Sequence, residues 1–457
     1  MKKESGSTVI IVGAGLVGSL LSIYLVKKGL SVEILEKRSD PRTAKLQEGR
    51  SINLALSHRG LRALKEASEN LHDEVLKEAV PMYGRQMHDE ESNLSFQAYG
   101  ANHECIYSVS RARLNNCLIN EAENHGVKFL FEHSIEHANV VDKQISITHG
   151  NDITVKNAPL LIAADGAFSR IRASLEEGGF CTSQLERIEH GYKELDIAPA
   201  QGKLLSNKNA LHVWPRGEYM FIALPNFDNS YTGTLFLPFN EEDVSFEQLN
   251  STEAIELFFK KHFPDTLALL PNLTEQYLKN PTSFLGNVYT DRWAFDTWLL
   301  IGDAAHGIVP FYGQGMNSGF EDCRILNTLL TAHNNNWSKA FNAFQTSRKK
   351  DTDAIARLAM DNFIEMRDLV ADDKFLLQKK IEGALTRALP DIWKSLYSEV
   401  SFSDTPYSEA LQIGKNNALI MKLIMNDTNI NIKKWEDPEQ WEKIVKLVNR
   451  SQVTGIS

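Results

Sequence analysis

The feature that most constrains the fold is a glycine-rich turn close to the start of the chain. Residues 8–12 read TVIIV, which is typical of a buried β-strand, and residues 13–18 read GAGLVG. A helix pattern follows over 16–28 and a second strand pattern over 32–35. Strand, glycine turn, helix and strand in this order predict a parallel sheet with a dinucleotide site at its first turn.

Each glycine of this turn has its own task. Gly13 permits the tight turn, Gly15 lets a pyrophosphate approach the backbone, and Gly18 lets the helix pack closely on the sheet. The free N–H groups at the start of the helix then face the phosphates. Glu36 follows the second strand, where a carboxylate can accept hydrogen bonds from ribose hydroxyls. The motif alone does not distinguish FAD from NAD.

The later elements predict that this first domain is interrupted and then resumed. Apolar strands are expected at 156–164 and 297–301, on either side of a region whose short strands are typical of an antiparallel sheet. Beyond residue 322 the pattern is mostly helical. We predict an α/β fold with a Rossmann-like dinucleotide domain, an inserted β-sheet substrate domain and a helical C-terminal region. The predicted ranges are 1–75 with 100–180 and 290–330, then 76–99 with 181–289, and finally 331–457.

Inside the inserted region, turn residues alternate with strand patterns. One turn is expected at Pro215-Arg216-Gly217 and another at 226–229. A helix is expected over 250–262, with Asn250 as its N-cap and Glu253 three positions further on. The expected strands are 210–213, 219–224 and 231–237.

Charge and cysteine content argue against several other classes of protein. The 457-residue chain has a net charge of −10, whereas nucleic-acid binding needs a clustered excess of Lys and Arg. Its four cysteines include no C-x-x-C pair, so we expect no metal site and a reduced, cytoplasmic protein. No apolar run approaches the roughly 18 residues of a membrane helix. We therefore expect neither a nucleic-acid partner nor a membrane partner.

Two motifs far along the chain resemble those of the flavoprotein monooxygenases. Residues 299–306 read LLIGDAAH, and in that family the Asp, here Asp303, binds the ribityl chain of FAD. The run GQGMN at 313–317 opens a helix whose N–H groups would face the flavin ring. Residues 164–172 read ADGAFSRIR, and this motif, with Asp165, is associated with both FAD and NADPH in the family. Asp-Gly alone is a common turn dipeptide, but three motifs in this order resemble the single-component FAD-dependent aromatic hydroxylases.

Shorter segments over most of the chain resemble one branch of these hydroxylases, the kynurenine 3-monooxygenase family. The resemblance extends from about residue 9 to about residue 407. It implies an FAD-binding domain, a substrate that is an aromatic amino acid, and a C-terminal region that covers the substrate site. The segments are GRSINLALS at 49–57, HGYKEL at 190–195, LHVWP at 211–215, VPFYGQGMN at 309–317 and NFIEMR at 362–367.

The resemblance also implies particular substrate contacts. Arg85 and Tyr99 match the family's ligands for the kynurenine carboxylate, and Arg suits a carboxylate because it donates two parallel hydrogen bonds. Asn362 and Tyr397 match two further substrate contacts. No side chain is expected to act as a nucleophile or general base. Tyr312 departs from the family pattern, since some relatives carry His or Phe there. The implied FAD contacts are Val17, Leu35, Glu36, Lys37, Arg38, Ala55, Arg111, Asp303, Met316 and Asn317.

The implied reaction needs two further co-substrates. NADPH reduces FAD, dioxygen converts the reduced flavin to a C4a-hydroperoxide, and the distal oxygen hydroxylates kynurenine to 3-hydroxykynurenine in the kynurenine pathway of tryptophan catabolism and NAD biosynthesis. The sequence holds no second G-x-G-x-x-G unit, so NADPH is expected to bind only transiently.

Other interpretations stay open. The nearest is an FAD-dependent hydroxylase of another aromatic acid, and a prenyl-chain reductase or a flavin-binding regulatory protein would share the motifs. A halogenase would need a W-x-W-x-x-I segment, which the sequence lacks. Animal members of the family end in a hydrophobic membrane segment, whereas residues 435–457 are polar. The oligomeric state, a homodimer included, is not determined by the sequence.

Overall fold

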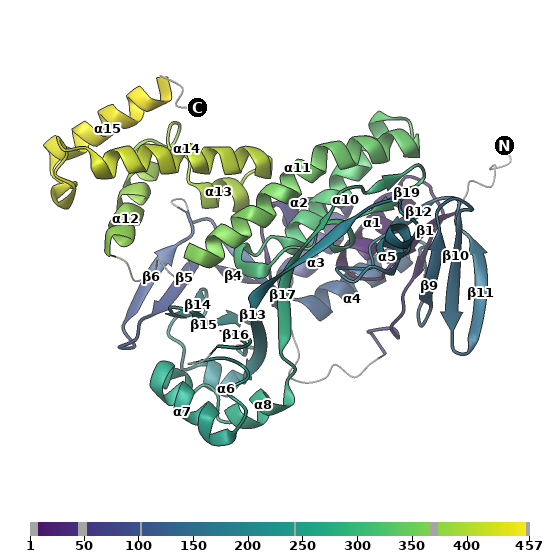
Figure 1. Ribbon diagram of the computed structural model, residues 1–457, viewed down its shortest axis with the longest axis horizontal. Coiled ribbons are helices and arrows are strands. Elements are labelled where there is room, and N and C mark those ends of the chain that lie inside the picture. The colour runs from purple at the N-terminus through teal and green to yellow at the C-terminus, as the bar shows by residue number, and fades with distance from the viewer. Residues whose placement is uncertain (1–7, 44–52, 101–102, 242–243, 366–372, 454–457) are drawn as a thin grey trace.

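A six-stranded sheet in the order β18-β19-β12-β1-β2-β8 forms the centre of the first part of the fold (Figure 1). Its strands pair in parallel except for β18 with β19. Buried β-branched and apolar residues fill β1, β12 and β19 and, apart from Glu33, β2, as expected for parallel strands covered on both faces. These strands are β1 (Val9–Val12), β2 (Val32–Leu35), β8 (Lys128–Leu130), β12 (Leu161–Ala163), β18 (Ala294–Phe295) and β19 (Trp298–Leu300). The computed structural model describes residues 8–43, 53–100, 103–241, 244–365 and 373–453.

Helices pack around this sheet and share one apolar core with it. Helix α1 contacts both α4 and α10, and α10 also contacts α2. Gly18 makes the first turn of α1 compact, because a Cβ atom there would lie 2.0 Å from the carbonyl oxygen of Gly13. The helices are α1 (Leu16–Lys27), α2 (His58–Ala67), α3 (Glu69–Lys77), α4 (Arg111–Asn124), α5 (Arg170–Glu177), α9 (Asp303–His306) and α10 (Gly315–Ala332).

The single strand predicted at 156–164 is wrong, because the structure divides it into two elements. Lys156 belongs to β11 (Asp152–Asn157), which forms a three-stranded antiparallel sheet with β10 (Gln144–His149) and β9 (Ser134–Asn139). Pro159 lies between β11 and β12, and a proline has no N–H group to donate to a neighbouring strand.

A seven-stranded sheet in the order β17-β13-β16-β15-β14-β5-β6 forms the second part. All its pairs are antiparallel except β14 with β5. Helices α7 (Thr252–His262) and α8 (Leu273–Lys279) contribute to an aromatic core with strands of this sheet. The strands are β5 (Gly84–His88), β6 (Leu94–Ala98), β13 (Ser183–Ile197), β14 (Leu211–Arg216), β15 (Tyr219–Pro225), β16 (Tyr231–Pro238) and β17 (Ser283–Thr290), and α6 (Pro199–Gly202) follows β13.

Two local predictions in this region are wrong. Pro215 and Arg216 continue β14, and the turn begins only at Gly217, whose φ is +67°. The N-cap of α7 is Ser251 rather than Asn250. The Ser251 hydroxyl accepts a hydrogen bond from the Ala254 N–H at 3.2 Å, whereas Asn250 donates to an upstream carbonyl.

A small sheet of β4 (Val80–Met82), β7 (Ile106–Ser110) and β3 (Asn53–Leu56) accompanies the two larger ones. The C-terminal helices are α11 (Trp337–Ile364), α12 (Asp373–Ala388), α13 (Leu396–Ser401), α14 (Tyr407–Asn426) and α15 (Pro438–Val453). In Figure 1, α12 to α15 lie at one end of the molecule, whereas α11 extends across its middle beside α10. Among the described residues, no helix combines the length and apolar character that crossing a membrane requires. The predicted α/β class is confirmed, and the exact domain boundaries stay a prediction.

Candidate functional site

The glycine turn between β1 and α1 contains two glycines that the fold itself requires and one that it does not. Gly13 has a φ of +103°, and a Cβ atom on it would lie 2.5 Å from the carbonyl oxygen of Ala164. A Cβ atom on Gly18 would lie 2.0 Å from the carbonyl oxygen of Gly13. Gly15 has an ordinary φ of −74°, and a Cβ there would meet none of the described atoms within 4 Å. Internal packing therefore leaves Gly15 unexplained, whereas a pyrophosphate lying against the backbone requires it, so the turn fits FAD.

Glu36 lies directly after β2 and faces this turn. Its Oε2 accepts a hydrogen bond from the Ala14 N–H at 2.8 Å, and its Oε1 accepts one from the Arg38 N–H at 2.9 Å. The two bonds hold the carboxylate at the edge of the turn, which is where a ribose contact is predicted. Leu35 is buried in the core, while Lys37 and Arg38 are exposed.

Val17, which follows the first glycine turn, packs against Gly302 and Gly319. A Cβ atom on Gly302 would lie 3.1 Å from Cγ2 of Val17, and a Cβ on Gly319 would lie 2.6 Å from the same atom. Gly302 has a φ of +60° and turns the chain from β19 into α9. Asp303 is the exposed first residue of α9. Because both glycines lack side chains, Val17 can pack between the Gly302 turn and α10, which brings Asp303 near the first turn.

The side chain of Asn317 holds the loop that precedes α10. Its Oδ1 accepts from the Ser57 N–H at 2.9 Å, and its Nδ2 donates to the carbonyls of Ala55 and Gly313 at 2.8 and 2.9 Å. The predicted contacts Ala55, Met316 and Asn317 therefore come together at the start of α10. Since the Asn317 amide is bonded within the protein, we expect FAD to be met by backbone N–H groups of this helix terminus.

Arg111 begins α4, and Asp165 lies five residues before the first residue of α5. Asp165 Oδ2 accepts from the Arg170 and Ile171 N–H groups at 2.8 and 3.3 Å, which caps α5. Burial raises the pKa of this carboxyl. A Cβ on Gly13 would lie 3.0 Å from the Cα of Asp165, so this residue borders the glycine turn. Arg111 is the exposed first residue of α4.

The predicted substrate residues Arg85, Tyr99 and Tyr397 lie together, away from the glycine turns in sequence. The guanidinium carbon of Arg85 is 5.9 Å from the Tyr99 ring centroid and 5.6 Å from that of Tyr397. The two rings stack with centroids 5.0 Å apart, and Tyr312 stacks on Tyr397 at 5.7 Å. The Nε atom of Arg85 is buried without a hydrogen-bond partner among the described residues. Burial raises the pKa of both Tyr99 and Tyr397, so their hydroxyls stay protonated donors.

Asn362 and Glu365 border this cluster. Asn362 donates its Nδ2 to the Phe311 carbonyl at 2.7 Å, next to Tyr312. Burial lowers the pKa of Arg85, but nearby charges that include Glu365 raise it, and the net shift is upward. Glu365 was missed by sequence analysis, although the segment 362–367 that points to Asn362 contains it. Residues 366–367 of that segment, and residues 49–52 of another, lie outside the described residues.

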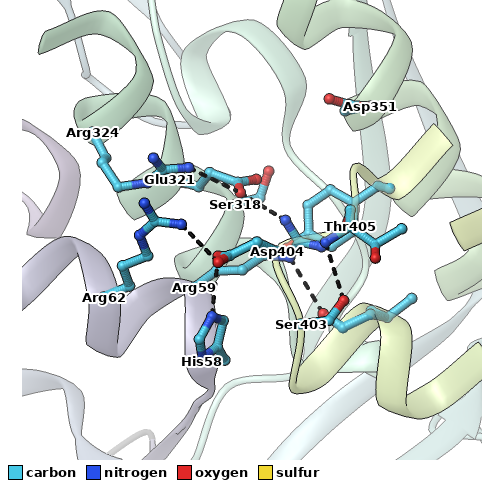
Figure 2. A network of polar contacts seen from close by, with 12 residues as sticks. His58, Arg59, Arg62, Ser318, Glu321, Arg324, Asp351, Ser403, Asp404 and Thr405 are labelled. Atoms are coloured by element: carbon cyan, nitrogen blue, oxygen red, sulfur yellow. Dashed lines mark hydrogen bonds and ion pairs between the residues drawn. The ribbon is translucent and has the colours of Figure 1, made fainter. Parts of the chain in front are cut away.

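A buried network of charged side chains, which no sequence pattern predicted, lies next to the Gly302 turn and α10. Arg348 of α11 donates to Asp322 Oδ1 and to Glu321 Oε2, both at 2.7 Å. His306 Nε2 lies 2.6 Å from Asp322 Oδ2, and Arg59 donates to Glu321 Oε1 at 2.6 Å. Burial raises the pKa values of Glu321 and Asp322, but the neighbouring cations outweigh it, so both shifts are downward. These contacts join α2, α9, α10 and α11. Figure 2 shows the part of the network around Arg59 and Glu321.

A cleft of about 1000 Å³ lies elsewhere, between helices α3 and α4 and one end of the inserted sheet. Both acidic and basic side chains line it, and Arg113 Nη1 lies 2.6 Å from Glu78 Oε2. None of the four predicted substrate residues lines it. We therefore place the candidate substrate site at Arg85 rather than in this cleft.

Known proteins resemble this chain in sequence and in fold. The family described as FAD binding domain matches residues 6–357. Kynurenine 3-monooxygenase of Cytophaga hutchinsonii is 49% identical over 97% of this chain and 99% of its own length. The enzyme of the same name from Flavobacterium psychrophilum is 45% identical over 98% of this chain and 99% of its own length.

A solved structure supports the fold alone. The tetrameric form of 2-methyl-3-hydroxypyridine-5-carboxylic acid oxygenase superposes with a TM-score of 0.65 at 20% identity, covering 81% of this chain and 95% of its own. The FAD binding domain match and the two relatives, which align over nearly their whole length, indicate the same family. The chain belongs to the kynurenine 3-monooxygenase family, among the FAD-dependent monooxygenases with an FAD binding domain.

Proposed function

We propose that the protein hydroxylates L-kynurenine to 3-hydroxykynurenine with NADPH and dioxygen as co-substrates, within tryptophan degradation. In the balanced reaction, kynurenine, NADPH, dioxygen and one proton give 3-hydroxykynurenine, NADP⁺ and water. The name of the two relatives, kynurenine 3-monooxygenase, supports kynurenine as the substrate. The observation that carries the proposal is Arg85, a half-buried cation beside two stacked tyrosine rings, whose buried Nε has no hydrogen-bond partner among the described residues.

The chemistry of this cluster matches the two ends of an aromatic amino acid. Arg85 would bind the carboxylate, because a guanidinium forms charge-assisted hydrogen bonds with it in a buried site. The hydroxyls of Tyr99 and Tyr397 are protonated and would donate to the same group. The aromatic faces of Tyr312 and Tyr397 would contact the apolar part of the substrate. These residues bind and orient the substrate and exclude water from it.

We also propose how the chain holds FAD, which supplies dioxygen activation once NADPH has reduced it. The pyrophosphate would lie at Gly15 and the start of α1, and a ribose would meet Glu36. Asp303 would accept hydrogen bonds from the ribityl hydroxyls. The N–H groups at the start of α10 would stabilise negative charge on the reduced ring.

A turnover assay tests this function. We expect kynurenine to accelerate NADPH oxidation by the purified, flavin-containing protein, and 3-hydroxykynurenine to accumulate in step with it. Salicylate and 4-hydroxybenzoate serve as comparison substrates, because a hydroxylase of another aromatic acid is the alternative. Kynurenine-stimulated NADPH oxidation that yields only hydrogen peroxide would contradict the proposal.

A further inference from the structure

Helix α13, which carries Tyr397, is too short to hold its own position. It has six residues, Leu396–Ser401, and no side chain caps its N-terminus. Isolated helices of fewer than about 12 residues are marginal in water, and the last carbonyls of any helix lack partners within it. The position of the Tyr397 ring therefore depends on contacts that other elements make with α13.

Arg59 of α2 provides buried hydrogen bonds to this region. Its Nε donates to the Val400 carbonyl of α13 at 3.3 Å, and its Nη2 donates to the Thr405 carbonyl just beyond the helix. Its Nη1 donates to Glu321 Oε1. Arg59 is 2% exposed, so these bonds form away from water. Figure 2 shows the guanidinium between α10 and the segment that contains Ser403 and Thr405.

The other side of this contact leads back to the cofactor loops. Glu321 also accepts from Arg348, and Arg348 donates to Asp322. Asp322 Oδ2 in turn accepts from the Gly302 N–H at 3.3 Å, directly before Asp303. A continuous chain of hydrogen bonds thus connects the Gly302 turn with the C-terminal end of α13.

Tyr407 makes a second connection between the same two regions. Its ring lies 4.1 Å from the guanidinium carbon of Arg59, and its hydroxyl donates to Gln314 Oε1 at 2.9 Å. Gln314 is the residue before α10, where the flavin ring is proposed to lie. Arg59 therefore occupies the point where both connections meet.

We propose that Arg59 is a positioning residue for substrate binding, a role that rests on the proposed function. It holds α13 against α2 and α10, and so keeps the Tyr397 ring stacked on Tyr99 beside Arg85. Arg59 acts through the backbone of α13 and touches neither the substrate residues nor the glycine turn. Its loss should therefore affect kynurenine binding more than FAD binding.

The test compares Arg59→Lys with Arg62→Lys in the full-length flavoprotein. Lysine keeps the positive charge near Glu321, but its single nitrogen cannot reproduce the planar fork that reaches both carbonyls. Arg62 is one turn further along α2, is 38% exposed and pairs with Asp404 of the same segment, so it is a matched control. The measurements are the KM and kcat for kynurenine, the FAD content, and hydrogen–deuterium exchange over residues 396–405.

For Arg59→Lys we expect the KM for kynurenine to rise about tenfold. This factor corresponds to the free energy of one lost charge-assisted hydrogen bond. Exchange over 396–405 should be faster and FAD content unchanged, whereas Arg62→Lys should match the wild type in all three. If Arg59→Lys does not fold, Glu321→Gln tests the same link and should raise KM in the same direction.

Unchanged KM and unchanged exchange in the Arg59 variant would overturn the proposal. So would a loss of FAD that accompanies the rise in KM, because this would mean a general loosening of the fold. A wild-type protein that does not hydroxylate kynurenine would instead defeat the proposed function. The exchange measurement would then still decide whether Arg59 holds α13.

Discussion

The ring of Tyr397 stacks on the ring of Tyr99, with the two centroids 5.0 Å apart. Tyr99 follows an edge strand of the inserted sheet, and Tyr397 belongs to a short helix of the C-terminal region. The candidate substrate site is thus assembled from two parts of the chain that no local sequence pattern connects. Each element that holds either ring in place therefore influences how the substrate binds.

Replacing Arg85 by Met should weaken kynurenine binding by about 2–5 kcal/mol, the range for removing one partner of a buried charge pair. Arg85→Lys should recover part of this loss, since it keeps the charge without the two-pronged geometry. Flavin absorbance changes on titration with kynurenine give the dissociation constant. Arg113→Met is the control. Arg113 is exposed, and in the described part of the chain its ion-pair partner is Glu78. Equal affinities for wild type and Arg85→Met would remove Arg85 from the site.

Gly15→Ala should bind FAD more weakly by about 1–3 kcal/mol, the cost of forcing a methyl group into an occupied space. The stability of its apoprotein should hardly change, because the new Cβ meets no described atom within 4 Å. Gly13→Ala should instead destabilise the apoprotein, since its Cβ would lie 2.5 Å from a backbone oxygen at a φ of +103°. Thermal unfolding of the apoproteins and FAD titration separate the two effects. Undiminished FAD affinity in Gly15→Ala would contradict the proposed place of the pyrophosphate.

His212 should make stability depend on pH in the acidic range. Burial lowers the pKa of its ring to about 4, whereas an unfolded histidine titrates near 6.5. Between these values the unfolded chain binds a proton that the folded chain does not, so stability falls as the pH falls from about 6.5 to about 4. The loss attributable to His212 is roughly 3 kcal/mol.

Denaturant unfolding at several pH values measures this effect as the difference between wild type and His212→Gln, which lacks the titrating group. The variant should show a smaller loss of stability over that range. His125→Gln, at an exposed position, should behave as the wild type does. Parallel pH profiles for wild type and His212→Gln would show that the ring is not held neutral.

Arg348→Met should lower the free energy of unfolding by about 3–5 kcal/mol, because it leaves two buried carboxylates without their shared cation. Lys443→Met removes an ion pair on the surface of α15 and should cost less than about 1 kcal/mol. Chemical denaturation of both variants at neutral pH checks the contrast. A loss of similar size in the two would mean that the buried network contributes no more than a surface pair.

The sequence by itself determined the features that depend on neighbouring residues. The glycine turn, the first parallel strands and the predicted α/β class follow from backbone conformation and from the repeat of apolar positions, which act over a few residues. Local rules failed where two signals competed. Pro159 divided an apolar run that looked like one strand, and Ser251 rather than Asn250 capped α7.

Only the tertiary structure decided which distant residues meet. Arg85 was identified through a resemblance, but its position beside two tyrosine rings depends on how α13 packs against the inserted sheet. Arg59 gave no signal in the sequence, because an arginine within an amphipathic helix is usually exposed. Its burial is favourable only because Glu321 and two backbone carbonyls converge on it in the folded chain. Such convergence is a property of packing, and no local pattern encodes it.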